Sequence, residues 1–270
     1  MNAASQAALA HHDTAAAMWG RGGKHYDDVS FAVSDALAHA AQRLNARPGE
    51  RILDVATGTG WSARNVARTG AAVTAVDISQ ELLAAARALS GHIRPAIAFR
   101  EGDAGRLPFE ERAFDGIIST FGVMFARDQA KAAHELARVC RSGGRLALTT
   151  WATEGSVAEF FGIIARHSDA PSPPSSPLAW GDPTHVEKLL GKAFDLKFER
   201  AVSNSYHRST EDIWELYTRS FGPLQQLVET LPAARMDQLK RDINDYHSSY
   251  AVAAGLHVKR EYLLTIGRRR

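Results

Sequence analysis

Apolar and polar positions repeat with two different periods along the middle of the chain. Five short runs between Arg51 and Trp151 are apolar, β-branched in places and bounded by Gly, Asp or Pro, as buried strands are. These runs are 51–55, 72–77, 96–100, 114–120 and 145–151. Between them, apolar residues recur at helical spacing in 61–69, 79–90 and 128–140. Strands that alternate with helices predict βαβ units and a parallel sheet covered on both faces.

The pattern is less regular after Trp151. The Pro/Ser-rich segment 168–183 predicts a loop. Helices are predicted at 184–193, 209–221 and 234–255, and strands at 194–203 and 256–267. Ser79 and either Ser209 or Thr210 are good N-caps, and Ser-Gly-Gly at 142–144 predicts the end of the helix 128–140.

Composition narrows the class of protein. With 45% apolar residues, 23% charged residues and a net charge of +2, the chain is an ordinary globular protein with no basic excess for a nucleic-acid partner. Cys140 is its only cysteine, and no His/Asp/Glu set has metal-ligand spacing, so we expect no disulfide and no metal. No apolar run approaches the roughly 20 residues that span a bilayer, and the start lacks the order of a signal peptide. We expect a cytoplasmic protein with no membrane partner.

The most informative stretch is LDVATGTGW, residues 53–61. Gly58, Gly60 and Ala63 fit the G-x-G-x-x-G/A spacing, and Asp77 ends the next predicted strand. Glycines let the backbone approach a ligand, the helix beyond them offers free N–H groups, and the acid accepts hydrogen bonds from ribose hydroxyls. The pattern therefore predicts an adenosine-containing ligand, and on this evidence NAD stays open.

Two further acids favour a different cofactor. Asp54 lies in the strand just before the turn, where a carboxylate opposes a pyrophosphate but suits a ligand with an ammonium and a sulfonium. Asp103 follows the third predicted strand, where it can accept a hydrogen bond from an adenine amino group. Both positions favour S-adenosylmethionine over NAD.

Taken in order, these motifs resemble a known family. Asp54–Gly60, Asp77, Gly102-Asp103-Ala104, FDGIISTFGVMFARD and RVCRSGGRLAL are similar to a class I S-adenosylmethionine-dependent methyltransferase of the ubiquinone/menaquinone-biosynthesis type. The resemblance covers roughly 47–151. It implies an α/β fold: a Rossmann-like, doubly wound, mostly parallel seven-stranded sheet with an antiparallel last strand, plus a helical cap.

The resemblance also implies site residues. The turn would wrap the methionine part of the cofactor, Asp77 would bind the ribose, Ile78 would pack on the adenine, and Asp103 with the Ala104 N–H would bind the adenine edge. Tyr26 is the candidate for closing the site. The full cofactor-binding set is Tyr26, Asp54, Ala56, Thr57, Gly58, Thr59, Gly60, Asp77, Ile78, Gly102, Asp103, Ala104, Thr120 and Phe121.

The motifs say less about the residues that would bind the methyl acceptor. Thr120 and Phe121 would lie beside the sulfonium, and Phe121, Met124, Phe125, Trp151 and Tyr217 are the expected walls of the substrate pocket. His25 is the candidate general base. The family often has glycine where this chain has Ala56, which argues against a positive φ at that residue. Trp61 is expected to pack against the N-terminal cap near Tyr26.

These observations predict a methyltransferase acting on a small, apolar or aromatic molecule. We expect a cap segment at 1–46, a cofactor-binding core at 47–151, a helical lid insertion at 152–255, and a closing strand with a basic tail at 256–270, all in one structural domain. Homodimerisation is left open. The alternatives are an NAD(P)-dependent Rossmann oxidoreductase, for which the segment after the fourth strand offers no Tyr/Lys pair, and a non-catalytic S-adenosylmethionine-binding protein.

Overall fold

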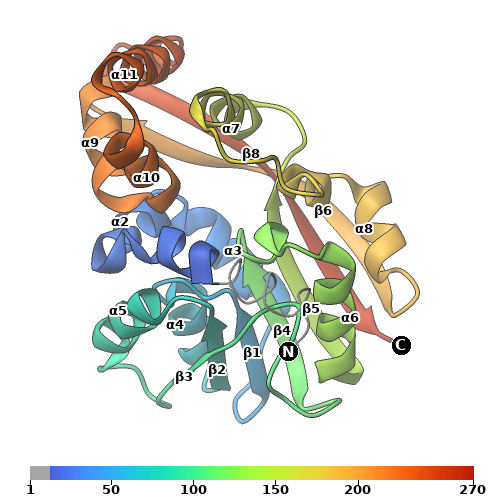
Figure 1. The fold of residues 1–270 in the computed structure, drawn as a ribbon. Coiled ribbons are helices and arrows are strands. Elements are labelled where there is room, and N and C mark those ends of the chain that lie inside the picture. Colours follow the sequence, from blue (N-terminus) through green and yellow to red (C-terminus); the bar gives the residue numbers. More distant parts are fainter. Residues whose placement is uncertain (1–12) are drawn as a thin grey trace.

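A mixed sheet forms the centre of the molecule (Figure 1). The computed structural model describes residues 13–270, so the first twelve residues of the expected cap segment lie outside it. Seven strands follow the order β3-β2-β1-β4-β5-β8-β6, and a two-residue β7 pairs with β8. The strands are β1 Arg51–Val55, β2 Ala72–Asp77, β3 Ala98–Glu101, β4 Phe114–Thr120, β5 Cys140–Trp151, β6 Phe194–His207, β7 Ala251–Val252 and β8 Gly255–Arg269.

The directions of the strands confirm the predicted fold class. Strands β3, β2, β1, β4 and β5 run parallel, whereas β8 is antiparallel to both β5 and β6. Strand β1 is buried over Ile52–Val55 because it lies between β2 and β4 in the centre of the sheet. Its carboxyl end therefore opens where parallel α/β sheets bind their ligands.

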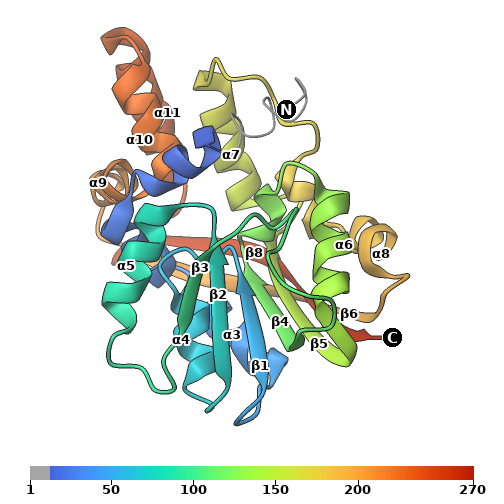
Figure 2. The same cartoon turned by 60° about the horizontal axis from the view of Figure 1, so that its bottom comes forward.

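Helices cover both faces of the sheet. They are α3 Ser34–Leu44, α4 Trp61–Ala67, α5 Gln80–Ser90, α6 Gln129–Val139 and α8 Pro183–Leu190. Figure 2 shows α3 and α4 behind the sheet and α6 in front of it. Ser79 caps α5 as predicted, because its hydroxyl accepts the Leu82 N–H.

The remaining helices form a cap above the carboxyl ends of the strands (Figure 1). Residues 13–20 are helical, and the other cap elements are η1 Gly23–His25, α2 Tyr26–Phe31, α7 Ser156–His167, α9 Thr210–Ser220, α10 Gly222–Thr230 and α11 Ala233–Ser248. Their apolar faces, with Leu256 and Val258 of β8, enclose a second hydrophobic core. The 310 helices η2 Val123–Phe125 and η3 Pro177–Gly181 complete the connections.

Three local expectations differ from the structure. The helix expected over 234–255 ends at Ser248, because β7 and β8 form a tight hairpin that places Gly255 at φ +119°. The Ser-Gly-Gly segment lies inside an irregular start of β5 rather than at a helix C-cap, since α6 already ends at Val139. The segment 168–183, expected to be a loop, contains η3. No helix of residues 13–270 has the length and apolarity to cross a bilayer.

Candidate active site

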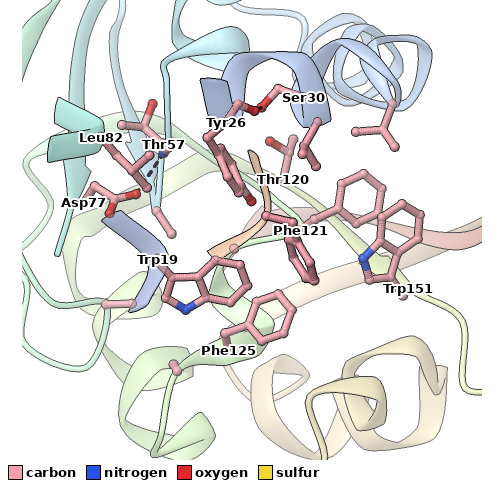
Figure 3. A pocket seen from close by; sticks show the side chains of 18 of the residues that line it. Trp19, Tyr26, Ser30, Thr57, Asp77, Leu82, Thr120, Phe121, Phe125 and Trp151 are labelled. Carbon is pink, nitrogen blue, oxygen red and sulfur yellow. Dashed lines mark hydrogen bonds between the residues drawn. The ribbon is translucent and has the colours of Figure 1, made fainter. Parts of the chain in front are cut away.

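A cavity of about 620 Å³ opens at the carboxyl ends of the parallel strands and beneath the cap (Figure 3). The turns after β1, β2, β3 and β4 line one part of it, and aromatic side chains from the cap line the other. We call the part lined by the strand-end turns, which includes Asp77 and Asp103, the polar half. We call the part lined by the aromatic side chains, which includes Trp19, Phe160 and Tyr217, the aromatic half. Their shared volume is within the range of about 300–1,000 Å³ that is typical of small-molecule sites.

The turn after β1 has an unusual backbone. Ala56 and Gly58 both have φ +55°, and Gly60 has φ +87°. The doubt about a positive φ at Ala56 was therefore wrong, because the residue adopts the left-handed conformation despite its methyl group. A side chain at Gly122 would approach Ala56 Cβ to 2.5 Å, so the turns after β1 and β4 pack directly on each other.

Asp77, at the end of β2, is joined to this turn by hydrogen bonds. Its carboxylate accepts the Gly58 N–H at 2.8 Å and the Ser79 N–H at 3.0 Å. Burial raises the pKa of the Asp77 carboxyl above its ordinary value, and the backbone N–H groups oppose this shift. Asp77 and Ile78 both line the cavity, so the carboxylate is oriented by the protein before any ligand binds.

Asp54 lies behind the turn. Its Oδ2 accepts the Thr57 hydroxyl at 2.6 Å, whereas its Oδ1 is buried and has no partner within residues 13–270. Burial raises the pKa of the Asp54 carboxyl to about 7. The side chain does not line the cavity, and in its ionised form its negative charge acts on the site through the turn.

Thr59 and Gly60 also face away from the cavity. The Thr59 hydroxyl donates to Asp27 of α2 at 2.7 Å, and Arg64 donates to the same carboxylate at 3.0 Å. These contacts fasten α2 to the turn after β1. Tyr26 of α2 does line the cavity, and a side chain at Gly58 would meet its ring at 3.3 Å. Gly58 therefore lets Tyr26 close over the turn.

The loop after β3 carries Gly102, Asp103 and Ala104 along the cavity. The Asp103 carboxylate accepts the Gly105 N–H at 2.8 Å, which fixes the start of the loop.

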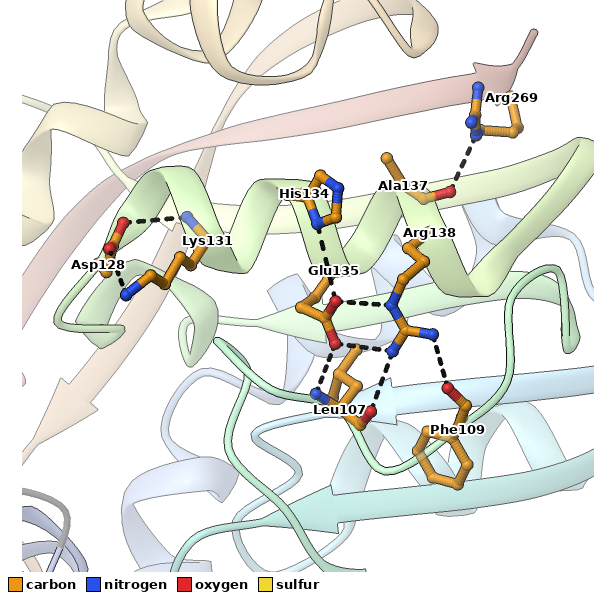
Figure 4. A network of polar contacts seen from close by, with 9 residues as sticks. All are labelled: Leu107, Phe109, Asp128, Lys131, His134, Glu135, Ala137, Arg138 and Arg269. Carbon is orange, nitrogen blue, oxygen red and sulfur yellow. Dashed lines mark hydrogen bonds and ion pairs between the residues drawn. The ribbon is translucent and has the colours of Figure 1, made fainter. Parts of the chain in front are cut away.

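An ion pair on α6 holds the end of the same loop (Figure 4). Glu135 accepts the Leu107 N–H at 2.7 Å and pairs with Arg138. Arg138 in turn donates to the carbonyl oxygens of Leu107 and Phe109. The loop that carries Asp103 is thus fastened to the helix between β4 and β5.

The segment after β4 joins the two halves of the cavity. Thr120 lies within hydrogen-bonding distance of Ser62, at 2.8 Å. Phe121 has φ +54° and stacks on Trp151, with ring centroids 3.7 Å apart and planes 12° apart. Phe125 packs against Trp19 of the cap at 4.8 Å. Met124 is fully buried and absent from the cavity wall, unlike its neighbour Phe125.

Most of the aromatic half was not found from the sequence. Tyr217 lines it as expected, but His25 is exposed and lies outside the cavity lining. The further aromatic residues that line it are Trp19, Phe160, Phe161, Phe221 and Tyr246. Their helical spacing resembles that of ordinary core residues, so only their convergence in space marks them. Trp61 contacts Phe31 of α2, with ring centroids 6.2 Å apart, and also lines the cavity.

Two buried polar side chains interrupt the aromatic half. Arg260 of β8 donates to the Ala32 carbonyl and to the Tyr217 hydroxyl. His247 of α11 lies 2.8 Å from the Ile243 carbonyl through Nδ1, so Nδ1 carries the proton and Nε2 is an acceptor. Burial and the positive charge of Arg260 lower the pKa of His247 to about 4, which keeps the ring neutral at pH 7.

Comparison with known proteins identifies the family. Residues 53–148 match a family described as a methyltransferase domain. An uncharacterized protein of Mycobacterium tuberculosis is 33% identical over 214 residues, which cover 77% of this chain and 76% of the relative. A demethylmenaquinone methyltransferase of Beutenbergia cavernae is 37% identical over 147 residues, 53% of this chain and 59% of the relative.

The chain belongs to the class I S-adenosylmethionine-dependent methyltransferases. A solved structure of the same fold is phosphoethanolamine N-methyltransferase 2 of Haemonchus contortus, in complex with phosphomonomethylethanolamine and S-adenosylhomocysteine. It is 20% identical, with a TM-score of 0.55, and the match covers 87% of this chain and 53% of that one. As a class I methyltransferase, the protein is an enzyme that uses S-adenosylmethionine as its methyl donor, which decides between the two cofactors left open by the turn.

The polar half fits this cofactor. The oriented Asp77 carboxylate offers acceptors for ribose hydroxyls, and the Asp54 carboxyl, when it is ionised, places negative charge behind the turn. Positively charged sulfonium and ammonium groups are favoured beside such a charge, whereas a pyrophosphate is opposed by it.

Proposed function

We propose that this methyltransferase transfers the methyl group to a small, apolar or aromatic molecule bound in the aromatic half of the cavity. The observation that supports the proposal is that one cavity joins a polar half, which includes the turn after β1, to an aromatic half that the cap helps to form. A net charge of +2 provides no excess of basic residues for a nucleic-acid substrate.

The lining residues of the polar half would hold the cofactor. Ala56, Thr57 and Gly58 would border its methionine part, with Tyr26 closing over them. Asp77 would accept from the ribose, and Ile78 would pack on the adenine. Asp103 and the Ala104 N–H would bind the adenine edge, while Thr120 and Phe121 would adjoin the reacting end. Asp54, Thr59 and Gly60 would act from behind the turn, by charge and by shaping the backbone.

The protein would contribute mainly by positioning. When bound, S-adenosylmethionine supplies a methyl group that its positive sulfur already activates. The stacked Phe121 and Trp151 would then orient a flat acceptor, and the cap would exclude water from the cavity. Where the acceptor carries a hydroxyl, the neutral His247 is the lining histidine with an acceptor nitrogen, a role that the exposed His25 does not fill.

Calorimetry tests the cofactor half of the proposal. S-adenosylhomocysteine should bind the wild type, and Asp77→Ala should weaken this binding about 10-fold or more, because charge-assisted hydrogen bonds are lost. Asp77→Asn keeps the shape of the side chain and should weaken it less. Asp195→Ala on β6, which removes an exposed ion pair with Arg270, is the matched control and should change nothing.

Transfer of labelled methyl from S-adenosylmethionine to a panel of aromatic and apolar small molecules tests the acceptor half. Tight binding of NAD, or unchanged S-adenosylhomocysteine binding in Asp77→Ala, would refute the assigned cofactor site. Transfer to RNA or protein but to no small molecule would refute the proposed acceptor class.

A further inference from the structure

Arg260 is a buried arginine in the aromatic half of the cavity. Its side chain comes from β8, and the residue is 6% exposed. The guanidinium donates to the Ala32 carbonyl oxygen at 3.2 Å and to the Tyr217 hydroxyl at 2.9 Å. Both partners are neutral, and no carboxylate of residues 13–270 forms an ion pair with Arg260.

The other buried arginine shows what such a charge ordinarily requires. Arg64 is 8% exposed, and its guanidinium pairs with the Asp27 carboxylate at 3.0 Å. A buried charge is costly unless it is paired, and an arginine cannot escape the cost by losing its proton. Within residues 13–270 Arg260 has no such partner, and it lines a cavity.

The guanidinium also has donors to spare. It carries five N–H groups in a planar fork, and the two contacts described above use two of them. Within residues 13–270 the other three N–H groups have no hydrogen-bond partner and are left for a ligand. A planar carboxylate matches two parallel N–H groups of this fork, and an ionised hydroxyl can accept from either.

The groups around Arg260 do not neutralise it. His247 is buried and His207 is half-buried, and the positive charge of Arg260 contributes to lowering the pKa of each to about 4. Asp212 opposes this shift at His207, but its carboxylate is paired with Arg208. The hydroxyl of Tyr217 and the ring of His247 are the neighbouring polar groups on the cavity wall. Asp35, whose carboxylate accepts the hydroxyl of Ser203 opposite Arg260 in the sheet, does not line the cavity. The aromatic half thus holds a positive charge that no carboxylate of its wall, among residues 13–270, pairs with.

We propose that the methyl acceptor is an apolar or aromatic molecule that carries an acidic group, a carboxylate or an ionised phenol or enol, and that this group pairs with Arg260. The inference rests on the proposed function, because it assigns the acceptor to the aromatic half. It sharpens that function: a neutral acceptor would fill the aromatic walls but leave the guanidinium unpaired, so Arg260 selects for the anion.

Matched pairs of probes test the inference. Binding of cinnamate and cinnamamide, and of 4-nitrophenolate and 4-nitroanisole, is measured by calorimetry at pH 8 with the protein saturated by S-adenosylhomocysteine. At least one anion should bind about 10- to 100-fold more tightly than its neutral partner, which is the range expected for a hydrogen bond between charged groups. The first pair tests a carboxylate and the second an ionised phenol.

Variants locate the effect at Arg260. Arg260→Gln should abolish the preference for the anion, whereas Arg260→Lys should retain part of it, because the charge stays but the fork is lost. Tyr217→Phe removes one hydrogen bond of the guanidinium but not its charge, and should preserve the preference. Arg269→Gln, on the same strand but bonded to the Ala137 and Ala193 carbonyls outside the cavity, is the control and should match the wild type.

The outcomes separate this inference from the proposed function. If the wild type does not bind S-adenosylhomocysteine, the proposed function fails. If it binds the cofactor product but binds both neutral probes as tightly as the anions, or binds neither anion, the inference fails alone. The wild-type comparison is decisive even if Arg260→Gln does not fold, and a retained preference in a folded Arg260→Gln protein overturns the inference as well.

Discussion

Replacing Asp54 by asparagine should make the protein more resistant to urea at pH 8 and should flatten the pH dependence of its stability. The Asp54 carboxyl is fully buried, and burial raises its pKa from 3.8 to about 7. The folded protein therefore holds this proton more tightly than the unfolded chain does. Stability then falls as pH rises through the interval between the two pKa values.

The two pKa values set the size of the effect. The two pKa values differ by about 3 units, and each unit corresponds to about 1.4 kcal/mol. Ionising Asp54 therefore lowers the free energy of unfolding of the wild type by about 4 kcal/mol above pH 8. At pH 5 the same two pKa values give a smaller loss of wild-type stability, about 1.5–2 kcal/mol. The asparagine amide leaves an N–H group without an acceptor, which costs about 1–3 kcal/mol at every pH. From pH 5 to pH 8, the free energy of unfolding of Asp54→Asn should therefore rise by about 2–3 kcal/mol relative to that of the wild type.

Urea unfolding of both proteins at pH 5, 6, 7 and 8, without cofactor, measures this difference. Asp115→Asn is a control of opposite sign, because the Arg51 N–H and the Arg141 guanidinium lower the pKa of Asp115. Its carboxylate stabilises the fold above its unfolded pKa of 3.8, so the variant should lose stability at neutral pH and gain nothing from pH 5 to pH 8. Parallel stability curves for the wild type and Asp54→Asn would refute the reasoning.

Substitutions at three further positions probe how the site is held. Arg138→Met should lower the free energy of unfolding by about 2–3 kcal/mol, because Glu135 loses its cation and the loop carrying Asp103 is released. The variant should also bind S-adenosylhomocysteine more weakly. Stability equal to that of the wild type would contradict the role given to Arg138. Ala56→Gly should leave stability equal or slightly higher, whereas Ala56→Val should cost about 2 kcal/mol or more, since a β-branched residue resists a positive φ; equal melting of the two would argue against the left-handed turn. Ser79→Ala should cost about 1 kcal/mol of α5 capping, measured by urea unfolding.

The polar half could be predicted because its signals are local. The turn after β1 and the acids after β2 and β3 follow strand ends directly, and parallel strands bring their carboxyl ends to one edge. The spacing of the apolar residues, and the Gly, Asp and Pro residues that bound each strand, were therefore enough to place Asp77 and Asp103 on the cavity wall. The direction of β8 also followed from the resemblance.

The aromatic half could not be predicted in the same way. Trp19, Phe160 and Arg260 come from segments far apart in the chain, and only the packing of the cap brings them together. Met124 was expected on the pocket wall together with Phe125, but only Phe125 lines the cavity. The 310 helix η2 turns Phe125 to the cavity and Met124 to the core, and a shift of one residue is beyond what a spacing pattern can specify.

Strand β8 has a consequence for the order in which the protein can fold. It lies between β5 and β6, and among residues 13–270 no other strand pairs with β6. Because β8 follows both in the chain, a ribosome releases β5 and β6 before the strand that joins them exists. Residues 194–207 cannot pair as a strand until β8 has been made, and until then their backbone is open to non-native strand pairing. Synthesis therefore completes the aromatic half of the cavity, with Arg260, only after the strands that carry the polar half have been made.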